Sequence, residues 1–145
     1  MSTSYFSIVI EHDVDLVWST VRDFNGLATW FASSVTESHI EDDLDSATVG
    51  AIRSFQLGEA RVRERLVSLS DGDRSYSYTF CDPAPFPVDV YVSTLRVTPV
   101  TATNHTFVEW WATFDCAAEG REHWSQFFAA EVFAPALGSL RHHLG

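Results

Sequence analysis

The chain has 145 residues, 46% of them hydrophobic and 14% aromatic, which is enough apolar material for one ordered domain spanning residues 1–145. Nine Lys and Arg against 20 Asp and Glu give a net charge of −11, which repels phosphate groups and excludes nucleic acid and anionic membranes as expected partners. There is no amino-terminal apolar signal segment and no apolar run near the roughly 20 residues of a membrane helix. We therefore expect a cytoplasmic protein without membrane insertion.

The first 40 residues predict one strand, two short helices and a second strand. Apolar and polar residues alternate over Tyr5–Glu11, which indicates a strand. Asp13 can cap a helix that ends near Arg22, since its side chain can accept hydrogen bonds from the first free N–H groups. Asn25-Gly26 then breaks the chain, and we expect a second short helix over residues 27–31. A strand over residues 35–40 follows.

The most specific pattern is a hairpin predicted over residues 50–69. Gly58-Glu59 has the Gly-X form of a two-residue type II′ turn. With this turn, the strands pair so that Arg53 lies directly opposite Glu64. Because side chains alternate faces along a strand, both point to one face, which is otherwise apolar. An acid and a base side by side on an apolar face indicate a polar spot inside a pocket.

Asp71-Gly72 has the form of a type I′ turn and predicts a following strand over residues 74–81. Counting pairs from that turn places Ser77 and Thr79 on the inward face, beside the ion pair. The two tyrosines that alternate with them are then expected to point outward.

The rest of the chain predicts a loop, two long strands and a long helix. Three prolines confine residues 82–87 to a loop, because proline cannot donate to a strand ladder. Long strands are expected over 88–100 and 105–116, and a helix over 121–144. The aromatic stripe of that helix is the available cover for the apolar face of the sheet. Pro135 lies inside the helix and is expected to kink it.

This order of elements resembles the START-like or SRPBCC superfamily, also called the Bet v 1-like helix-grip fold. Within it, the chain is similar to the polyketide cyclase/dehydrase and lipid-transport group, with the plant abscisic-acid receptors as distant relatives. The matching stretches are Val49–Arg53, Arg63–Leu66, Asp71–Tyr78, Tyr91–Ser93, Val108–Trp111 and Phe128–Leu140.

The resemblance implies an α+β fold in which a curved seven-stranded antiparallel sheet wraps around a long C-terminal helix, with two short helices after the first strand. A large cavity between sheet and helix would hold a hydrophobic small molecule. The receptor gate loop is shortened here to Leu57–Ala60, and serines stand where the hormone-binding lysine is expected. Abscisic acid and a phosphatase partner are therefore not implied.

The resemblance also implies candidate site residues. The receptor acid that matches Glu64 faces the ligand, and the same is implied for Tyr91, Ser93 and Glu109. Two acids in an apolar cavity raise the pKa of at least one of them, which gives a general acid near neutral pH. Arg53 is expected to lower the pKa of Glu64 and to polarise a substrate carbonyl. The alternatives are an inert buried ion pair and a Glu109 that points to solvent beside a buried Trp110.

Aromatic and apolar residues supply the remaining candidate ligand contacts, and core packing is the alternative reading for each of them. They are Trp30, Phe31, Phe55, Trp111, Trp124, Phe127, Phe128 and Val132. None of the six histidines has metal-ligand spacing to Cys, Asp or Glu, and no Gly-rich phosphate loop or nucleophile elbow is present. We therefore expect neither a metal nor a cofactor.

Three functions fit this sequence. The first is a cofactor-independent polyketide-type cyclase, aromatase or dehydratase, in which Arg53 polarises a carbonyl and Glu64 or Glu109 moves a proton. The second is a non-catalytic carrier or sensor of a lipid, sterol or aromatic ligand. The third is a co-chaperone-like interaction module, which needs an exposed apolar patch. The pattern indicates no particular oligomeric state.

Overall fold

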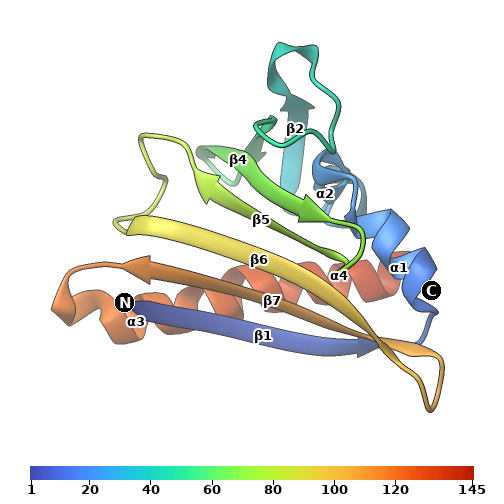
Figure 1. The fold of residues 1–145 in the computed structure, drawn as a ribbon. Helices are drawn as coiled ribbons and strands as arrows, with labels where there is room; N and C mark the ends of the chain where they lie inside the picture. The colour runs from blue at the N-terminus through green and yellow to red at the C-terminus, as the bar shows by residue number, and fades with distance from the viewer.

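Seven antiparallel strands form one curved sheet in the computed structural model, which describes residues 1–145 (Figure 1). Across the sheet the order is β1-β7-β6-β5-β4-β3-β2, so the first strand of the chain pairs with the last. The strands are Ser2–Ile10 (β1), Val35–Ile40 (β2), Ile52–Leu57 (β3), Ala60–Ser70 (β4), Ser75–Phe80 (β5), Asp89–Val100 (β6) and His105–Asp115 (β7).

Helices cover one face of this sheet. The α-helices are Val14–Val21 (α1), Leu27–Trp30 (α2), Arg121–Phe127 (α3) and Ala134–Leu144 (α4), and a π-helical segment, Phe128–Phe133 (η4), joins α3 to α4. Single 3₁₀ turns cover Phe24–Gly26 (η1), Glu41–Asp43 (η2) and Ala118–Gly120 (η3). Figure 1 shows the continuous α3–η4–α4 helix running along the sheet, which confirms the predicted helix-grip fold. None of these helices combines the length and hydrophobicity needed to cross a bilayer.

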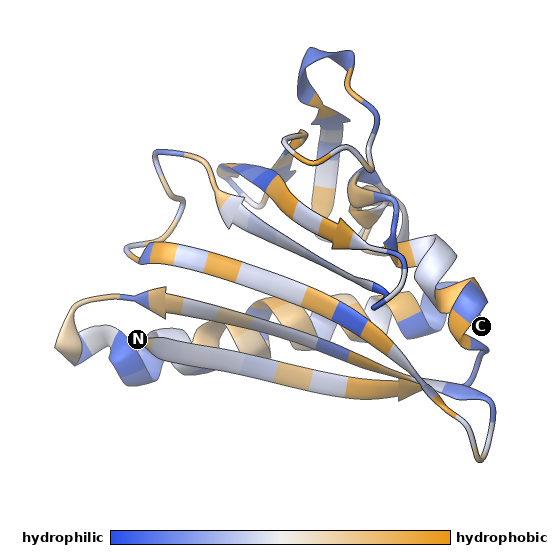
Figure 2. Ribbon diagram, viewed as in Figure 1, coloured by the Kyte–Doolittle hydropathy of each residue, from blue (hydrophilic) through white to orange (hydrophobic).

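Alternating hydropathy determines which face of each strand meets the helix (Figure 2). In β7, Val108, Trp110, Ala112 and Phe114 are buried, whereas the residues between them lie on the outer face. The helix contributes its own buried row, which consists of Phe128, Phe133, Ala136, Leu137 and Leu140. At the other end of the chain, the Asp13 carboxylate accepts hydrogen bonds from two N–H groups of α1, as the capping prediction required.

The predicted β3–β4 hairpin is confirmed in register. Gly58 has a φ of 60°, as the first central residue of a type II′ turn requires. Leu57 pairs with Ala60, and Arg53 consequently pairs with Glu64. The ion pair on the inner face thus follows from the turn alone.

The predicted β4–β5 register is wrong. The loop has four residues, because Ser70 pairs with Ser75, and Arg74 at its end takes a φ of 51°. A β-bulge then lies between Leu66 and Ser68, where both Val67 and Ser68 are exposed. A loop that is two residues longer than predicted leaves each β5 side chain on its predicted face of the sheet. The one extra residue of the bulge moves each β5 side chain to the opposite face.

The exchange reverses the expectation for the whole of β5. Tyr76 and Tyr78 point inward and are 1% and 2% exposed. Ser77 and Thr79, predicted to face the ligand, lie on the outer face, where the Ser77 hydroxyl bonds that of Thr94 at 2.7 Å. Phe80, and not Thr79, stands opposite Glu64.

The C-terminal helix is interrupted where a side chain enters its hydrogen-bond ladder. In a regular α-helix, the Ala129 N–H would bond the Ser125 carbonyl. Here the Ser4 hydroxyl of β1 stands between them, accepting from the Ala129 N–H at 2.8 Å and donating to the Ser125 carbonyl at 2.5 Å. The Ala134 N–H then bonds the Ala129 carbonyl five residues back, as in a π-turn.

Pro135 follows this π-turn, in the first turn of α4. A proline has no N–H to donate and its ring crowds the carbonyl four residues before it, so a widened turn accommodates it. The irregularity that we expected as a kink at Pro135 is therefore a π-turn that precedes it.

Candidate functional site

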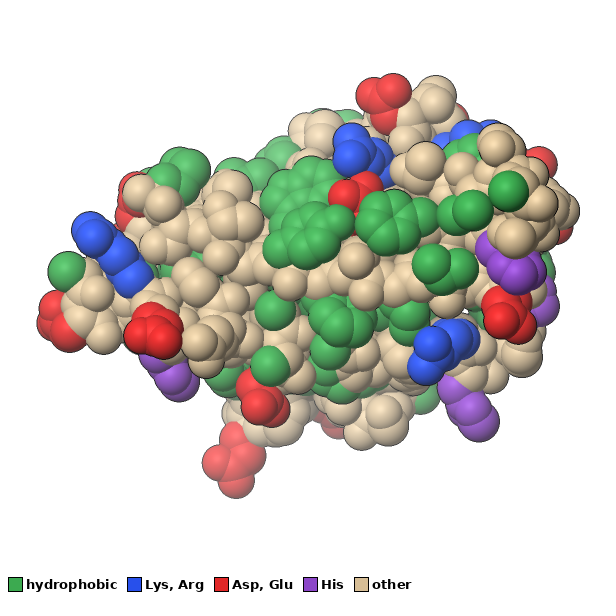
Figure 3. All heavy atoms as spheres, turned by 90° about the horizontal axis from the view of Figure 1, so that it is seen from below, with side chains coloured by type: hydrophobic (Ala, Val, Ile, Leu, Met, Phe, Trp, Pro, Cys, Tyr) green, Lys and Arg blue, Asp and Glu red, His purple; other side chains and the backbone are tan.

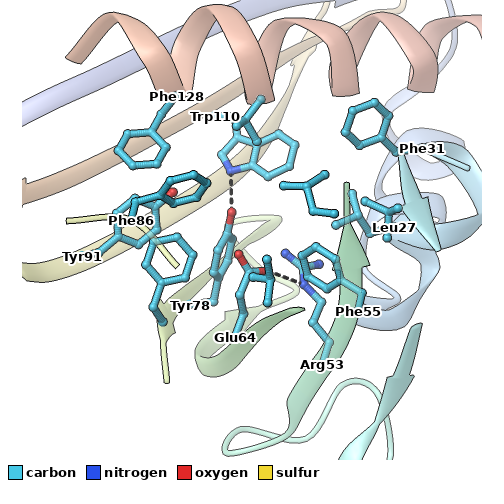
Figure 4. A pocket seen from close by; sticks show the side chains of 15 residues that line it. Leu27, Phe31, Arg53, Phe55, Glu64, Tyr78, Phe86, Tyr91, Trp110 and Phe128 are labelled. Atoms are coloured by element: carbon cyan, nitrogen blue, oxygen red, sulfur yellow. Dashed lines mark hydrogen bonds and ion pairs between the residues drawn. The ribbon is translucent and has the colours of Figure 1, made fainter. Parts of the chain in front are cut away.

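A small, partly open cavity lies between sheet and helix beside the Arg53–Glu64 pair (Figure 4). Thirteen of its 15 lining residues are hydrophobic, and Arg53 and Glu64 are the other two. The space open to water-sized molecules is about 30 Å³, room for about two waters. The large cavity implied by the family resemblance is thus wrong in size for this conformation, in which aromatic rings fill most of the space.

Arg53 holds Glu64 in a fixed orientation. Its Nε donates to Glu64 Oε1 at 2.7 Å, and the two side chains are only 1% and 7% exposed. Its Nη1 donates to the Phe24 carbonyl at 2.9 Å, and the guanidinium lies 4.0 Å from the centre of the Phe24 ring. Its Nη2 is buried without a partner. The second oxygen of Glu64 accepts no hydrogen bond, so one acceptor remains free at the cavity wall.

Burial sets the electrostatics of this pair. Desolvation raises the pKa of Glu64, and the nearby Arg53 only partly offsets it. Arg53 does lower the pKa of Glu64, as expected, but burial has the larger effect and the net shift is upward, because the sequence did not show how completely the carboxylate is buried. Burial also opposes the charge of Arg53, but Glu64 and two tyrosines outweigh it and raise the arginine pKa. Arg53 accordingly stays protonated, and Glu64 is the group of the pair that can exchange a proton.

Two tyrosines bring neutral hydroxyls to the same cavity. Burial raises the pKa values of Tyr78 and Tyr91, so both keep their protons near neutral pH. Tyr78 Oη accepts a hydrogen bond from Trp110 Nε1 at 3.1 Å. Tyr91, which the family resemblance implies as a ligand contact, lines the cavity as expected. The sequence reasoning missed Tyr78, although Tyr-Ser-Tyr alternation in β5 indicates an aromatic face.

Ser93 also points inward, but internal contacts occupy its hydroxyl. It accepts from Trp110 Nε1 at 2.9 Å and donates to the Trp111 carbonyl at 3.1 Å. Ser93 therefore orients Trp110, a cavity-lining residue, from behind the wall.

Three aromatic rings separate the cavity from an open depression of about 520 Å³ along the proline-rich loop. Phe80, Phe86 and Tyr91 line both spaces. The Phe80 and Tyr91 rings stack at 4.1 Å, while Phe86 packs against Phe127 at 5.2 Å and Phe128 at 5.5 Å. The separation is therefore one side chain thick, and the sequence reasoning missed Phe86 because it lies in a loop.

The structure brings together about half of the predicted site residues. Those that line the cavity are Arg53, Glu64, Phe31, Phe55, Tyr91, Phe128 and Val132. Trp30 is buried behind the wall, 6.2 Å from the Trp110 ring centre. Trp124 and Phe127 pack on Phe86 from the helix side and do not line the cavity. These three belong to the aromatic core around the site.

Glu109 and Trp111 lie on the outer face of β7, so their placement in the cavity is wrong. Glu109 accepts hydrogen bonds from the Tyr5 hydroxyl at 2.7 Å and from Arg96 Nη2 at 3.0 Å. Trp111 stacks beside Tyr5 with ring centres 6.4 Å apart. Side chains alternate between the two faces along a strand, and Trp110 faces the helix, so its neighbours Glu109 and Trp111 point to the outer face.

The surface in Figure 3 offers no broad apolar face to a protein partner. Hydrophobic side chains there lie in small groups among polar atoms and charges of both signs. The exposed large hydrophobic residues of the chain come from separate elements, including Leu16, Val49, Val67 and Val90. The interaction-module alternative therefore gains no support on this face. No three His, Cys, Asp or Glu side chains are grouped to hold a metal ion.

Residues 1–144 match the family described as polyketide cyclase / dehydrase and lipid transport. The chain is similar to a solution NMR structure from Thermobifida fusca, with 32% identity, a TM-score of 0.86 and coverage of 97% of this chain and 91% of that one. It is also similar to a protein from Nitrosospira multiformis, with 25% identity, a TM-score of 0.82 and coverage of 99% and 96%.

A norcoclaurine synthase from Thalictrum flavum, solved in complex with dopamine and hydroxybenzaldehyde, shares the fold at 13% identity. The TM-score is 0.77, and the match covers 99% of this chain and 86% of that one. No curated protein sequence matches the chain.

Proposed function

Because the chain belongs to the polyketide cyclase / dehydrase and lipid transport family, we propose that it binds a hydrophobic, oxygen-bearing small molecule beside Glu64 and acts on it as a cofactor-independent cyclase, aromatase or dehydratase. One observation carries the proposal: a single carboxylate is held by a buried arginine in a wall that is otherwise apolar. A buried ion pair adds little net stability compared with apolar residues of similar volume, so a role in orienting a bound molecule accounts for its place in this wall.

Glu64 is the proton acceptor in this proposal. Its Oε1 is fixed by Arg53, so the free oxygen takes a proton from a ligand hydroxyl or from a C–H beside a carbonyl. The raised pKa makes the carboxylate a stronger base than a solvated glutamate. The guanidinium of Arg53, which lines the cavity, polarises the ligand carbonyl, and Tyr91 supplies a neutral hydroxyl. Enclosure holds the reacting groups of the ligand close together, which raises the rate without a cofactor.

A non-catalytic carrier or sensor is the second candidate, and the direct Arg53 Nε–Glu64 Oε1 ion pair, which ties the carboxylate to a structural partner, favours it. A binding protein needs only an apolar cavity with one or two orienting polar groups. Native mass spectrometry of protein purified from its source tests what both candidates share: a retained neutral aromatic or polyketide-like molecule is expected. A protein that carries none, and that fails to bind neutral aromatics such as 2-naphthol, would exclude both.

Phe86→Ala is expected to speed the binding of 2-naphthol by about 5- to 30-fold. The cavity is too small for this ligand, so binding requires an open state, and the packing of the half-buried Phe86 ring holds that state back by about 1–2 kcal/mol. Removing the ring joins the cavity to the open depression. Stopped-flow fluorescence measures the association rate.

Val90→Ala is the matched control for this change. Val90 lines the outer depression but not the cavity, and it is 66% exposed. It is expected to leave the rate as in the unaltered protein. Equal rates in Phe86→Ala and the unaltered protein would show that ligands enter by another route.

A further inference from the structure

Ser4 lies outside the cavity, yet it interrupts the helix that forms one of the cavity walls. It is 1% exposed and its hydroxyl is both donor and acceptor between the Ser125 carbonyl and the Ala129 N–H. Where a hydroxyl interrupts the backbone hydrogen bonds of a helix, the next turn can contain one extra residue, as in a π-turn. Here the π-helical segment begins at Phe128.

The extra residue decides which side chain faces the sheet. The buried row of the helix steps back from Leu140 to Leu137 and Phe133, at the spacing of three or four residues typical of an α-helix. The next step of four residues would reach Ala129. The buried residue is instead Phe128, five residues back and 1% exposed. Figure 4 shows its ring directed from the helix toward the cavity.

We propose that Ser4 is a positioning residue that sets the size of ligand the cavity accepts, because it holds the π-turn that places Phe128 instead of Ala129 at the wall. The part of this inference that concerns ligand size rests on the proposed function, whereas the part that concerns the helix geometry does not. No ligand contact by Ser4 is involved.

The chemistry of the serine hydroxyl explains why this residue type is needed. It is short, and it donates and accepts at once, so it satisfies both ends of the broken helix bond. Without it, the nearest protein partners that the Ser125 carbonyl and the Ala129 N–H can bond are each other, as in a regular α-helix. When this direct hydrogen bond forms, the helix loses the extra residue of its π-turn, and α3 rotates by about 100° about the helix axis. The buried leucines of α4 hold α4 in place, so α3 is the part that rotates. Phe128 then leaves the wall and the methyl group of Ala129 replaces it.

The test compares the dissociation constants of 2-naphthol and the larger 9-phenanthrol, measured by fluorescence titration. Ser4→Ala and Phe128→Ala are each expected to shift the ratio at least about tenfold toward 9-phenanthrol, because both remove the ring from the wall. The Ser4→Ala/Phe128→Ala double variant is expected to shift it no further than Phe128→Ala alone, because Ser4 acts through Phe128. Ser4→Thr keeps the hydroxyl and is expected to keep the original ratio.

Ser2→Ala is the matched control, since Ser2 lies on the same strand and face and makes no side-chain hydrogen bond. It is expected to leave the ratio unchanged. Should Ser4→Ala not fold, Ser4→Cys, whose thiol bonds more weakly, gives the same test with a smaller shift. Weaker binding of both probes in equal proportion would show that Ser4 only stabilises the fold, and would overturn the inference.

A crystal structure of Ser4→Ala separates this inference from the proposed function. We expect the Ala129 N–H to bond the Ser125 carbonyl and Ala129 to face the sheet. A retained π-turn with Phe128 in place would overturn the inference whatever the probes do. A closed helix, together with no binding of either probe by the unaltered protein, would support the positioning role and refute the proposed ligand class.

Discussion

Replacing Arg53 by methionine is expected to lower the free energy of unfolding by about 3–5 kcal/mol. The change leaves Glu64 with no cation in a site where its side chain is 7% exposed. A buried carboxylate without a partner must either stay charged in an apolar environment or take up a proton, and both are unfavourable at neutral pH. Urea denaturation followed by circular dichroism measures the loss.

The loss is expected to depend on pH with a definite sign. Without Arg53, the pKa of Glu64 in the folded state rises further above the ordinary 4.5. A group with a raised folded-state pKa contributes its full stability below the unfolded pKa and loses it as the pH rises through the folded one. The destabilisation of Arg53→Met should therefore be largest at neutral pH and shrink toward pH 4.5.

Two further variants show whether the effect belongs to the pair. Arg53→Met/Glu64→Leu replaces both charges by apolar groups of similar volume and is expected to recover most of the lost stability. Arg63→Met removes an arginine from the outer face of the same hairpin, where its partner is Glu41 at 2.7 Å, and is expected to have little effect because Arg63 is exposed and Glu41 partly so. Equal losses in Arg53→Met and Arg63→Met would contradict the buried-pair account.

The hairpin that carries this pair could be predicted from sequence because one local signal fixes it. A two-residue turn sets the register of both strands, and the register sets the faces. The Gly58-Glu59 turn therefore placed Arg53 opposite Glu64 without any knowledge of the rest of the chain. The turn gives no information about how deeply Glu64 is buried, and for that reason the predicted net direction of its pKa shift is wrong.

The neighbouring strand pair could not be predicted because its register depends on a bulge. Val67 and Ser68 have no residue signature that marks an extra residue, and a shift by one exchanges the faces. The alternation of Tyr76 and Tyr78 was the competing signal for the true orientation. For Glu109, the strand pattern itself placed Trp110 on the apolar face, and the family resemblance was the weaker guide. Cavity size depends on whether aromatic rings line or fill the space, which composition does not specify.

Glu64→Gln is expected to abolish general-base activity of the cavity, lowering it by about 10²- to 10⁴-fold. The elimination of 5-nitrobenzisoxazole tests this directly, since the substrate is a small neutral aromatic. A base removes the ring C–H proton, the C–H electrons form the nitrile, the N–O bond breaks, and its electron pair leaves on the phenolate oxygen. Glutamine keeps the shape of Glu64 but cannot accept that proton. The Phe86→Ala background, with its cavity opened, is the protein in which to measure absorbance of the phenolate product.

The pH profile identifies Glu64 as the base. Only the ionised carboxylate accepts a proton, so the rate should fall as the pH drops through the pKa of Glu64, with a midpoint above the ordinary 4.5 because burial raises it. Glu109→Gln is the matched control, since Glu109 lies on the outer face and bonds Tyr5 and Arg96. We expect Glu109→Gln to keep both the elimination rate and its pH dependence. In Glu64→Gln, the residual rate should no longer fall as the pH is lowered.

The result also decides between the two proposed functions. If Glu64→Gln binds 2-naphthol but no longer catalyses elimination, Glu64 is an accessible base, as a cyclase or dehydratase requires. If the elimination rate is the same in Glu64→Gln, the carboxylate takes no proton from a bound ligand. The Arg53–Glu64 pair would then orient ligands without reacting with them, and the carrier or sensor would be the better account, because such a protein needs the enclosure and not the base.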